Sequence, residues 1–161
     1  MVAAMGCAAD APSAGVSDEE ALDLLESVRA ADYATWYAPR PDGTTPARSA
    51  APHGEISVVY VSPELAAVAM AMLGPDDEPP EVWPAGSIAV SIGSTSDAPV
   101  DVSLLQIARR DEHGWTWAQY DHRDRVLAYG RPGTCIGCHQ SGNDFIFSVP
   151  FPEPEESEPG G

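Results

Sequence analysis

The strongest constraint on this chain is the five-residue sequence Cys135-Ile136-Gly137-Cys138-His139. Two cysteines lie three positions apart and a histidine follows directly, a pattern typical of covalent haem c attachment. Each thiol adds to one vinyl group of the macrocycle, and the histidine then lies beneath the iron as its proximal ligand. The spacing needs a tight local turn, which Gly137 favours. The sequence therefore predicts one haem c, bound through Cys135 and Cys138, with His139 as the iron ligand.

Three other roles for these cysteines have less support. A thioredoxin-like Cys-x-x-Cys would follow a strand in a βαβ unit, and no such pattern surrounds residues 135–139. A zinc site needs four ligands, but the third cysteine, Cys7, lies far away in a polar segment. A disulfide across two residues would be strained and would leave His139 without a role. We therefore favour haem attachment.

Composition and charge restrict the class of partner. The chain has 161 residues, enough for one domain with tails, and 43% of them are hydrophobic. It carries 25 acidic residues against 8 basic ones, a net charge of −17, and every basic residue is an arginine. This balance argues against nucleic acid and anionic lipid, and favours a solvated acidic surface or a basic redox partner. The apolar runs are too short to predict a membrane span.

The N-terminal residues bear on the cellular location of the protein. Bacterial haem c attachment takes place outside the cytoplasm, so we expect a periplasmic or otherwise extracytoplasmic protein. Residues 1–16 lack the basic and apolar regions of a complete secretory signal, and we expect a flexible leader on a mature form. Ala4-Met5-Gly6-Cys7 resembles a lipoprotein processing site, which makes Cys7 a candidate lipid anchor. The alternative is that Cys7 is a residual thiol.

Hydrophobic patterns and turn residues predict an α+β fold in which a predominantly antiparallel sheet of four or five strands packs against two helices. The haem domain covers residues 17–149, and residues 150–161 are expected to form a disordered acidic tail. A capping box at Ser17 and Glu20 begins the first helix, and Pro63 begins the second. The predicted helices are 18–37 and 63–73, with loops at 38–52 and 74–84. The predicted strands are 55–61, 87–92, 100–110, 115–121 and 126–129, with hairpin turns at 111–114 and 122–124.

A haem motif behind a run of β-strands differs from the small helical cytochromes c. The arrangement resembles the cytochrome P460 superfamily, which also includes the cytochromes c′-β. The segments that carry the resemblance are His53-Gly54 with strand 58–61, residues 83–88, residues 114–121, and the haem motif followed by residues 144–147. The resemblance implies an antiparallel β fold, usually a homodimer, that carries one haem c with His139 as proximal ligand.

The chain departs from this family on the distal side of the haem. Hydroxylamine-oxidising members bond a lysine to the porphyrin, and the resemblance puts Ser91, or Ile92 in an alternative alignment, at that position. No lysine is present in the sequence, so this cross-link cannot form. The c′-β relatives use bulky apolar side chains instead, and Ile56 matches one of them. The resemblance also brings Arg131 near the distal pocket, where it would bind an anion or a haem propionate; the alternative is a surface arginine.

Function then depends on the second axial position of the iron. If it is vacant, the haem binds small diatomic ligands, and the resemblance implies nitric oxide. If a side chain fills it, the protein carries electrons. Met70, Met72 and His53 are candidate ligands, although packing is the simpler role for the methionines and a surface role for His53. His113 and His122 fall in turns and are also expected at the surface.

The leading hypothesis is thus an extracytoplasmic mono-haem c cytochrome that binds diatomic ligands, transfers electrons, or both. The alternative is a haem enzyme that acts on nitrogen oxides, hydroxylamine or peroxide through an open distal site, helped by Ser91 or Arg131. The sequence leaves open whether the protein is an enzyme, and the absence of lysine disfavours hydroxylamine oxidation. Trp115 and Trp117 alternate with Thr116, so both indoles are expected on the core side of one strand.

Overall fold

The chain alternates strands with short turns and adds helices before, within and after them. A computed structural model describes residues 18–38, 47–48, 53, 56–71, 81–94 and 103–140. The leader with Cys7, the capping residue Ser17, segment 144–147 and tail 150–161 lie outside the described residues. The elements are α1 (Asp18–Ala30), a 3₁₀ turn η1 (Tyr33–Thr35), β1 (Ala47–Arg48), β2 (Ile56–Val61), α2 (Pro63–Ala71), β3 (Ile88–Ser94), β4 (Leu104–Asp111), β5 (Gly114–Asp121), β6 (Val126–Gly130) and α3 (Gly133–His139).

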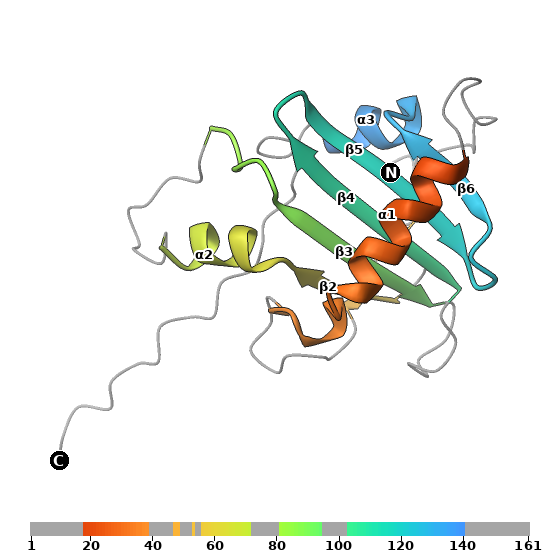
Figure 1. The fold of residues 1–161 in the computed structure, drawn as a ribbon, viewed down its shortest axis with the longest axis horizontal. Helices are drawn as coiled ribbons and strands as arrows, with labels where there is room; N and C mark the ends of the chain where they lie inside the picture. The colour runs from red at the N-terminus through yellow and green to blue at the C-terminus, as the bar shows by residue number, and fades with distance from the viewer. Residues whose placement is uncertain are drawn as a thin grey trace, which may run out of the picture.

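The strands form one antiparallel sheet in the order of the chain, β1-β2-β3-β4-β5-β6. The β4–β5 hairpin is paired along its full length, from Leu104 opposite Asp121 to Asp111 opposite Gly114. At its tip Gly114 has a φ of 120°, a backbone conformation that side chains disfavour. The predicted α+β fold and its mainly antiparallel sheet are confirmed, and Figure 1 shows α1 lying across the sheet.

One face of the sheet packs against α1. Apolar positions on α1 recur at helical spacing, and alternate residues of β3, β4 and β5 face them. Tyr120 is fully buried there, and its hydroxyl donates a hydrogen bond to the carbonyl of Ala21 in α1. The buried residues of this core are Ala21, Leu24, Leu25, Val28, Val90, Leu105, Ile107, Ala118 and Tyr120.

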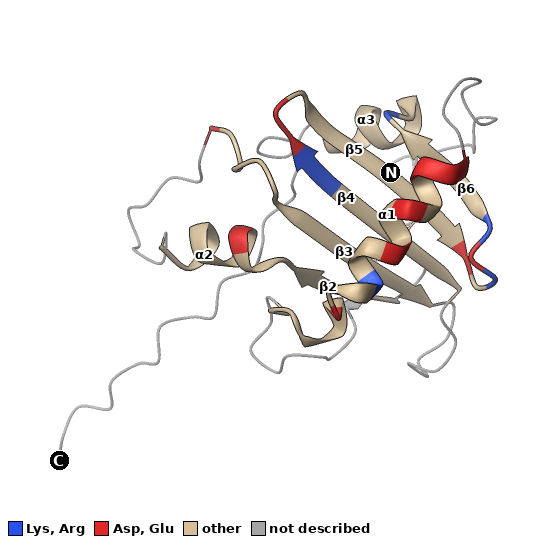
Figure 2. Ribbon diagram, in the orientation of Figure 1, with Lys and Arg blue, Asp and Glu red and all other residues tan. Residues whose placement is uncertain are grey.

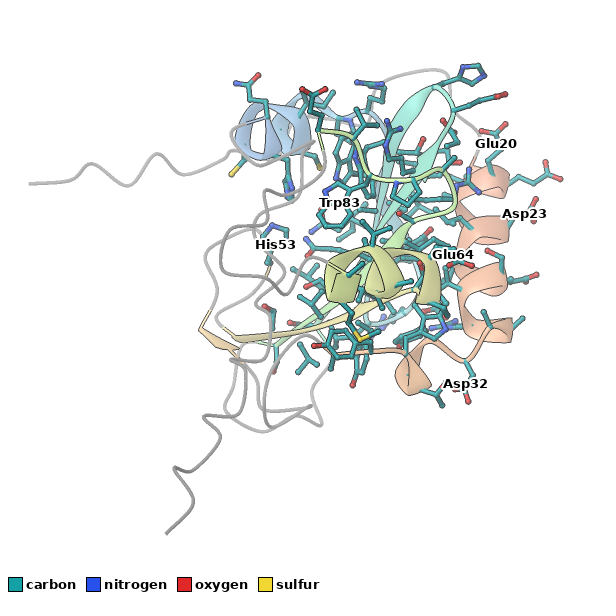
Figure 3. The ribbon with its side chains drawn as sticks, turned by 90° about the vertical axis from the view of Figure 1, so that its left-hand side faces the viewer. Glu20, Asp23, Asp32, His53, Glu64 and Trp83 are labelled. Atoms are coloured by element: carbon teal, nitrogen blue, oxygen red, sulfur yellow. The ribbon has the colours of Figure 1, made fainter. Side chains whose placement is uncertain are left out.

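The other face carries a second core, here called the tryptophan cluster. Its buried residues are Val61, Leu65, Ala66, Ala69, Trp83, Trp115 and Trp117, and Cys135 and Ile136 of α3 pack against it. These residues join α2, the strands β2 and β5, and α3 on the side of the sheet opposite α1. Figure 3 shows α1 and α3 on these opposite sides. The expectation that Trp115 and Trp117 share a buried side of β5 is confirmed.

The predicted first helix is too long. It ends at Ala30 rather than at residue 37, because Asp32 adopts a left-handed conformation with a φ of 50° and a 3₁₀ turn follows. The indole N–H of Trp36 donates to the carbonyl of Ala31 at the helix end. Tyr37 is then extended and accepts a hydrogen bond from the backbone N–H of Val61 in β2. Pairing with the sheet therefore ends the helical segment.

Four further expectations are corrected. The motif was predicted to form a tight turn, and the fold to have two helices; residues Gly133–His139 instead form a third helix, α3. The predicted loop 38–52 includes the short strand β1, which pairs with β2. Met70 was expected in the core of α2, but its side chain is 46% exposed.

In the part of the chain that the structure describes, no helix is long and apolar enough to cross a membrane.

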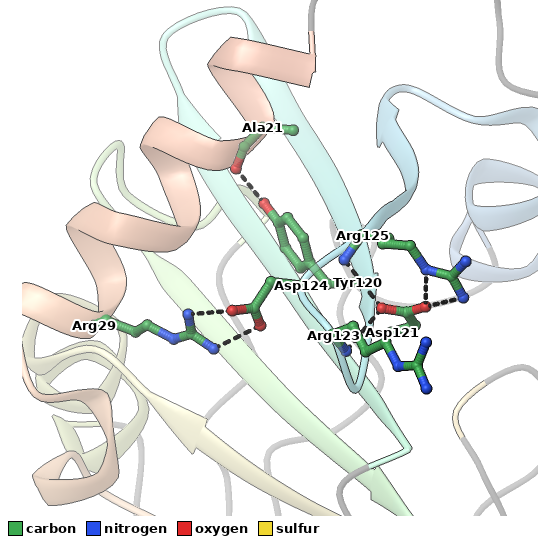
Figure 4. A network of polar contacts seen from close by, with 7 residues as sticks. All are labelled: Ala21, Arg29, Tyr120, Asp121, Arg123, Asp124 and Arg125. Atoms are coloured by element: carbon green, nitrogen blue, oxygen red, sulfur yellow. Dashed lines mark hydrogen bonds and ion pairs between the residues drawn. The ribbon is translucent and has the colours of Figure 1, made fainter.

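A polar network fixes the β5–β6 turn, which leads into the strand before α3 (Figure 4). The carboxylate of Asp121 accepts hydrogen bonds from the backbone N–H groups of Arg123 and Arg125 and from Nε of Arg125, at 2.6–3.0 Å. Burial raises the pKa of Asp121, but these hydrogen bonds outweigh it and lower the pKa to about 2. The turn is therefore held by a carboxylate that stays charged well into acid.

The same turn is tied to α1. Both terminal nitrogens of Arg29 donate to the carboxylate of Asp124, each at 2.8 Å. The hydrogen bond from Arg29 lowers the pKa of Asp124. Because both side chains are about half exposed, this fork-shaped ion pair positions the turn more than it stabilises the fold.

Candidate haem attachment site

The motif lies on α3, directly after the last strand. Gly130 ends β6 with a φ of 95° and turns the chain, and Pro132 precedes the helix in an extended conformation. The backbone N–H of Ile136 donates to the carbonyl of Pro132, and that of Gln140 to the carbonyl of Ile136. The helix thus runs through Gly137, and residues three or four apart lie on one side of it.

The two cysteines and the histidine share this helical side. Cys135 precedes Cys138 by three positions and His139 by four, so the three side chains emerge close together. Cys135 is half-buried against the tryptophan cluster, whereas Cys138 is exposed. The two sulfurs are not joined in a disulfide. The arrangement offers two thiols and one imidazole along a single short helix.

The imidazole of His139 lies next to two rings from distant parts of the chain. The centroid of its ring is 6.1 Å from that of Trp117 in β5, and the planes are tilted by 52°. It is 5.8 Å from that of His53, in an edge-to-face arrangement at 71°. His53 precedes β2, and Figure 3 shows it on the same side of the sheet as α3. The fold therefore brings two imidazoles together across 86 residues of sequence.

His53 is held by a strand in the middle of the sheet. Its Nδ1 lies 2.5 Å from Oε1 of Gln106, a half-buried residue of β4. Because an amide oxygen only accepts hydrogen bonds, Nδ1 is the donor, and the neutral ring then carries its lone pair on Nε2. Gln106 thereby fixes both the tautomer and the orientation of His53.

Small and polar residues surround Gln106 on this face. Ser91 of β3 and Gln119 of β5 are its direct neighbours across the strands. Residues two apart on β3 share the face, so Ala89 and Gly93 accompany Ser91 there. The strand that the family resemblance aligns with a lysine thus presents three small residues beside the His53–Gln106 pair.

The remaining predicted site residues are exposed, or their side chains lie outside the described residues. Arg131 is exposed, and its Nη1 donates to the carbonyl of His113 at 3.5 Å, at the tip of the β4–β5 hairpin. Ile56 opposes Ser94 at the start of β2, and its side chain lies outside the described residues. Met70 lies on α2, and Met72 is outside the described residues. These roles stay predictions.

Gln106 was missed by the sequence analysis, although a signal was present. In strand Leu104–Asp111, Leu105 and Ile107 face α1, so Gln106 lies on the opposite face, where Ala108 follows it. A half-buried amide at such a position needs a hydrogen-bond partner, which in the structure is His53. His113 and His122 are exposed in turns, as expected.

The side chains at α3 match what a haem c requires. Haem c needs two thiols three positions apart and an imidazole next to the second, and α3 provides them on one side. The large macrocycle needs apolar and aromatic surroundings, and Trp117 and the tryptophan cluster adjoin the helix. Among the described residues, no group of three or more His, Cys, Asp or Glu side chains is arranged to hold a metal ion. The residues present fit a haem c.

No protein-family model matches this sequence, and no curated protein is significantly similar to it. The function must therefore be argued from the residues of the site.

Proposed function

We propose that this protein is an extracytoplasmic mono-haem c cytochrome of the cytochrome P460 and c′-β type without the lysine cross-link. The observation that carries the proposal is the common side of α3, on which two cysteines that form no disulfide and an imidazole emerge next to the sheet. The aromatic neighbours of His139 and the small residues of β3 support it. The resemblance to the superfamily supports the same chemistry.

The cysteines and the histidine of α3 would have different roles in binding the haem. Cys135 and Cys138 would each add a thiol across one vinyl group, so that sulfur bonds to one vinyl carbon and the proton goes to the other. His139 would ligate the iron, while Trp117 packs beside its ring and limits its movement. When bound, the haem would supply one-electron redox chemistry and an axial position for a ligand. Half-burial of Cys135 against the tryptophan cluster would keep α3 in place before attachment.

Two activities follow from this site, electron transfer and the binding of diatomic ligands such as nitric oxide. The resemblance puts Ser91, or Ile92 in the alternative alignment, at the lysine position, and the chain contains no lysine, so we propose that hydroxylamine oxidation is not its function. An enzyme acting on peroxide or nitrogen oxides would need a general acid or base beside the bound ligand. His53, which lies beside His139, would be the candidate for that role, and its hydrogen bond to Gln106 is compatible with either activity.

The charge distribution suggests where a redox partner would bind. Figure 2 shows acidic residues along α1, and Figure 3 shows that α1 and α3 lie on opposite sides of the sheet. An electron entering through α1 would have to cross the sheet. We therefore propose that a redox partner, or a second copy of the chain in a homodimer, would use the α3 side, and that α1 is a solvated acidic surface.

The test is maturation of the full chain in a bacterial host that attaches haem c in the periplasm. The proposal predicts one covalent haem per chain and a thioether-type pyridine haemochrome spectrum. The double variant C135S/C138S should lose the covalent haem, and C7S, which removes the third cysteine, should keep it. Circular dichroism would show whether C135S/C138S retains its sheet. A wild-type chain without covalent haem, matured beside a haem-loaded control cytochrome, would refute the proposal.

A further inference from the structure

We infer that Nε2 of His53 is the second axial ligand of the haem iron, with Gln106 as the residue that positions it. This inference rests on the haem attachment proposed above. Two imidazoles from segments 86 residues apart meet beside the sheet, with ring centroids separated by 5.8 Å. His139 of this pair is the residue that follows the two thiols. His53 therefore offers a second nitrogen donor beside the ring of the proposed proximal ligand, His139.

The separation of the two rings matches what one shared metal requires. A metal–imidazole bond is about 2.0–2.1 Å long and a ring centroid lies roughly 1 Å beyond its nitrogen, so two imidazoles on one metal have centroids about 6 Å apart. The observed 5.8 Å is close to that span. The interplanar angle of 71° is compatible with two rings that each direct a nitrogen at a shared metal. The pair is spaced as two axial ligands are spaced.

The hydrogen bond to Gln106 prepares His53 for this role. Ligating histidines usually donate their second ring N–H to an oxygen, which fixes the tautomer and directs the other nitrogen to the metal. Nδ1 of His53 meets Oε1 of Gln106 at 2.5 Å, so the lone pair lies on Nε2. Gln106 comes from the centre of the sheet, where β3 and β5 flank it on both sides. The backbone of the orienting residue is therefore held by strand pairing on both sides.

The other candidate ligands are less well placed. Met70 is 46% exposed on α2. Ser91 lies next to Gln106, but it offers only a hydroxyl, a weaker ligand for haem iron than imidazole. His113 and His122 are exposed in hairpin turns. Of the imidazoles in the described residues, His53 is the one whose ring contacts that of His139.

Ligation by His53 would decide between the two proposed activities. An iron held by two imidazoles is saturated, so it passes electrons without binding a substrate, and an added ligand must first displace His53. Because methionine ligation raises the potential, a bis-histidine site is expected to have a lower potential than a His/Met cytochrome. Electron transfer would be the main function, and nitric oxide binding would be slow.

The test compares absorption and electron paramagnetic resonance spectra of haem-loaded wild type, H53A, Q106L and two controls. The wild type should be low-spin in both oxidation states, and H53A should become high-spin and bind carbon monoxide at least about tenfold more tightly. Added imidazole should return H53A to the low-spin spectrum, an effect that a structural defect would not give. Q106L should weaken the axial bond by about 10–100-fold, seen as a mixed spin state and faster carbon monoxide binding.

The controls separate ligation from nearby changes. H113A removes an exposed imidazole and should leave every spectrum unchanged. Q119L makes the same side-chain change as Q106L on the neighbouring strand, opposite Gln106 in register, and should also leave the spin state unchanged. A high-spin wild type, or a low-spin spectrum that H53A does not alter, would overturn the inference while leaving haem attachment intact. Absence of covalent haem from the wild type would instead refute the proposed function.

Discussion

Substitution of Tyr120 by phenylalanine tests whether β5 and α1 are joined as described. The phenol is fully buried, and its hydroxyl donates to the carbonyl of Ala21 in the first turns of α1. Y120F keeps the ring and its packing and removes one buried hydrogen bond. A hydrogen bond of this kind contributes about 0.5–1.5 kcal/mol net, and a buried acceptor that loses its donor adds a penalty of about 1–3 kcal/mol. We therefore expect the free energy of unfolding to fall by about 1–3 kcal/mol.

The measurement is urea unfolding at neutral pH, followed by circular dichroism and by tryptophan fluorescence. Y129F is the matched control, because Tyr129 is half-buried beside the same core on the neighbouring strand. It should change the free energy of unfolding by less than Y120F does. Equal effects of the two substitutions, or a Y120F protein as stable as the wild type, would show that the hydroxyl of Tyr120 is not held by Ala21.

The pH dependence gives an independent readout of Tyr120. Burial raises the pKa of its phenol above the usual value of 10. A raised pKa means that the stability linked to this group is complete below pH 10 and is lost as the pH rises beyond it. The wild type should lose stability above pH 10, and Y120F should have a flatter alkaline limb. Identical alkaline limbs would contradict this placement of the phenol.

Three further predictions concern charge and chemistry. The pKa of Asp121 is lowered from 3.8 to about 2, so its contribution to stability is present above pH 4 and lost between pH 4 and 2. The variant D121N should therefore lower Tm at neutral pH and flatten the decline of Tm in that acid range. An unchanged decline of Tm between pH 4 and 2 would refute the role of this turn. The exposed pair of Arg29 and Asp124 should have a coupling energy of at most about 1 kcal/mol in a double-mutant cycle of R29Q and D124N, whereas a much larger value would mean that the pair is buried in solution. The haem-loaded protein should not turn over hydroxylamine with an artificial electron acceptor, because the chain has no lysine, and steady turnover would contradict that reasoning.

The sheet could be predicted from the sequence because its signals are local. β-Branched and aromatic runs separated by short polar turns specify hairpins, and hairpins between successive strands specify an antiparallel sheet in chain order. The alternation of Trp115 and Trp117 likewise gave their common face. Each of these inferences uses residues only a few positions apart.

The errors arise where distant parts of the chain meet. The first helix ends early because Tyr37 pairs with Val61, a contact that helical periodicity at 18–37 does not contain. The motif forms a helix because α3 packs on the tryptophan cluster, which overrides the helix-weakening effect of Gly137. Met70 is exposed because α2 directs its other apolar residues to the sheet.

The candidate site was predictable in part. The order of Cys135, Cys138 and His139 identifies an attachment motif without any knowledge of the fold. The hydrogen bond of His53 to Gln106 and its ring contact with His139 could not be predicted, because the positions of these residues are set by the register of β4 and by the packing of α3. The sequence identifies the candidate donor residues, and the three-dimensional structure determines which of them lie close together.

The central claim is that a porphyrin is bonded to both thiols of α3. Trypsin cleaves after Arg125, and Pro132 blocks cleavage after Arg131, so the peptide that begins at Val126 contains both Cys135 and Cys138. After export and maturation, mass spectrometry should find this peptide heavier by one haem, with neither thiol open to alkylation. A peptide with the mass of bare polypeptide, alkylated at both cysteines, would contradict the account.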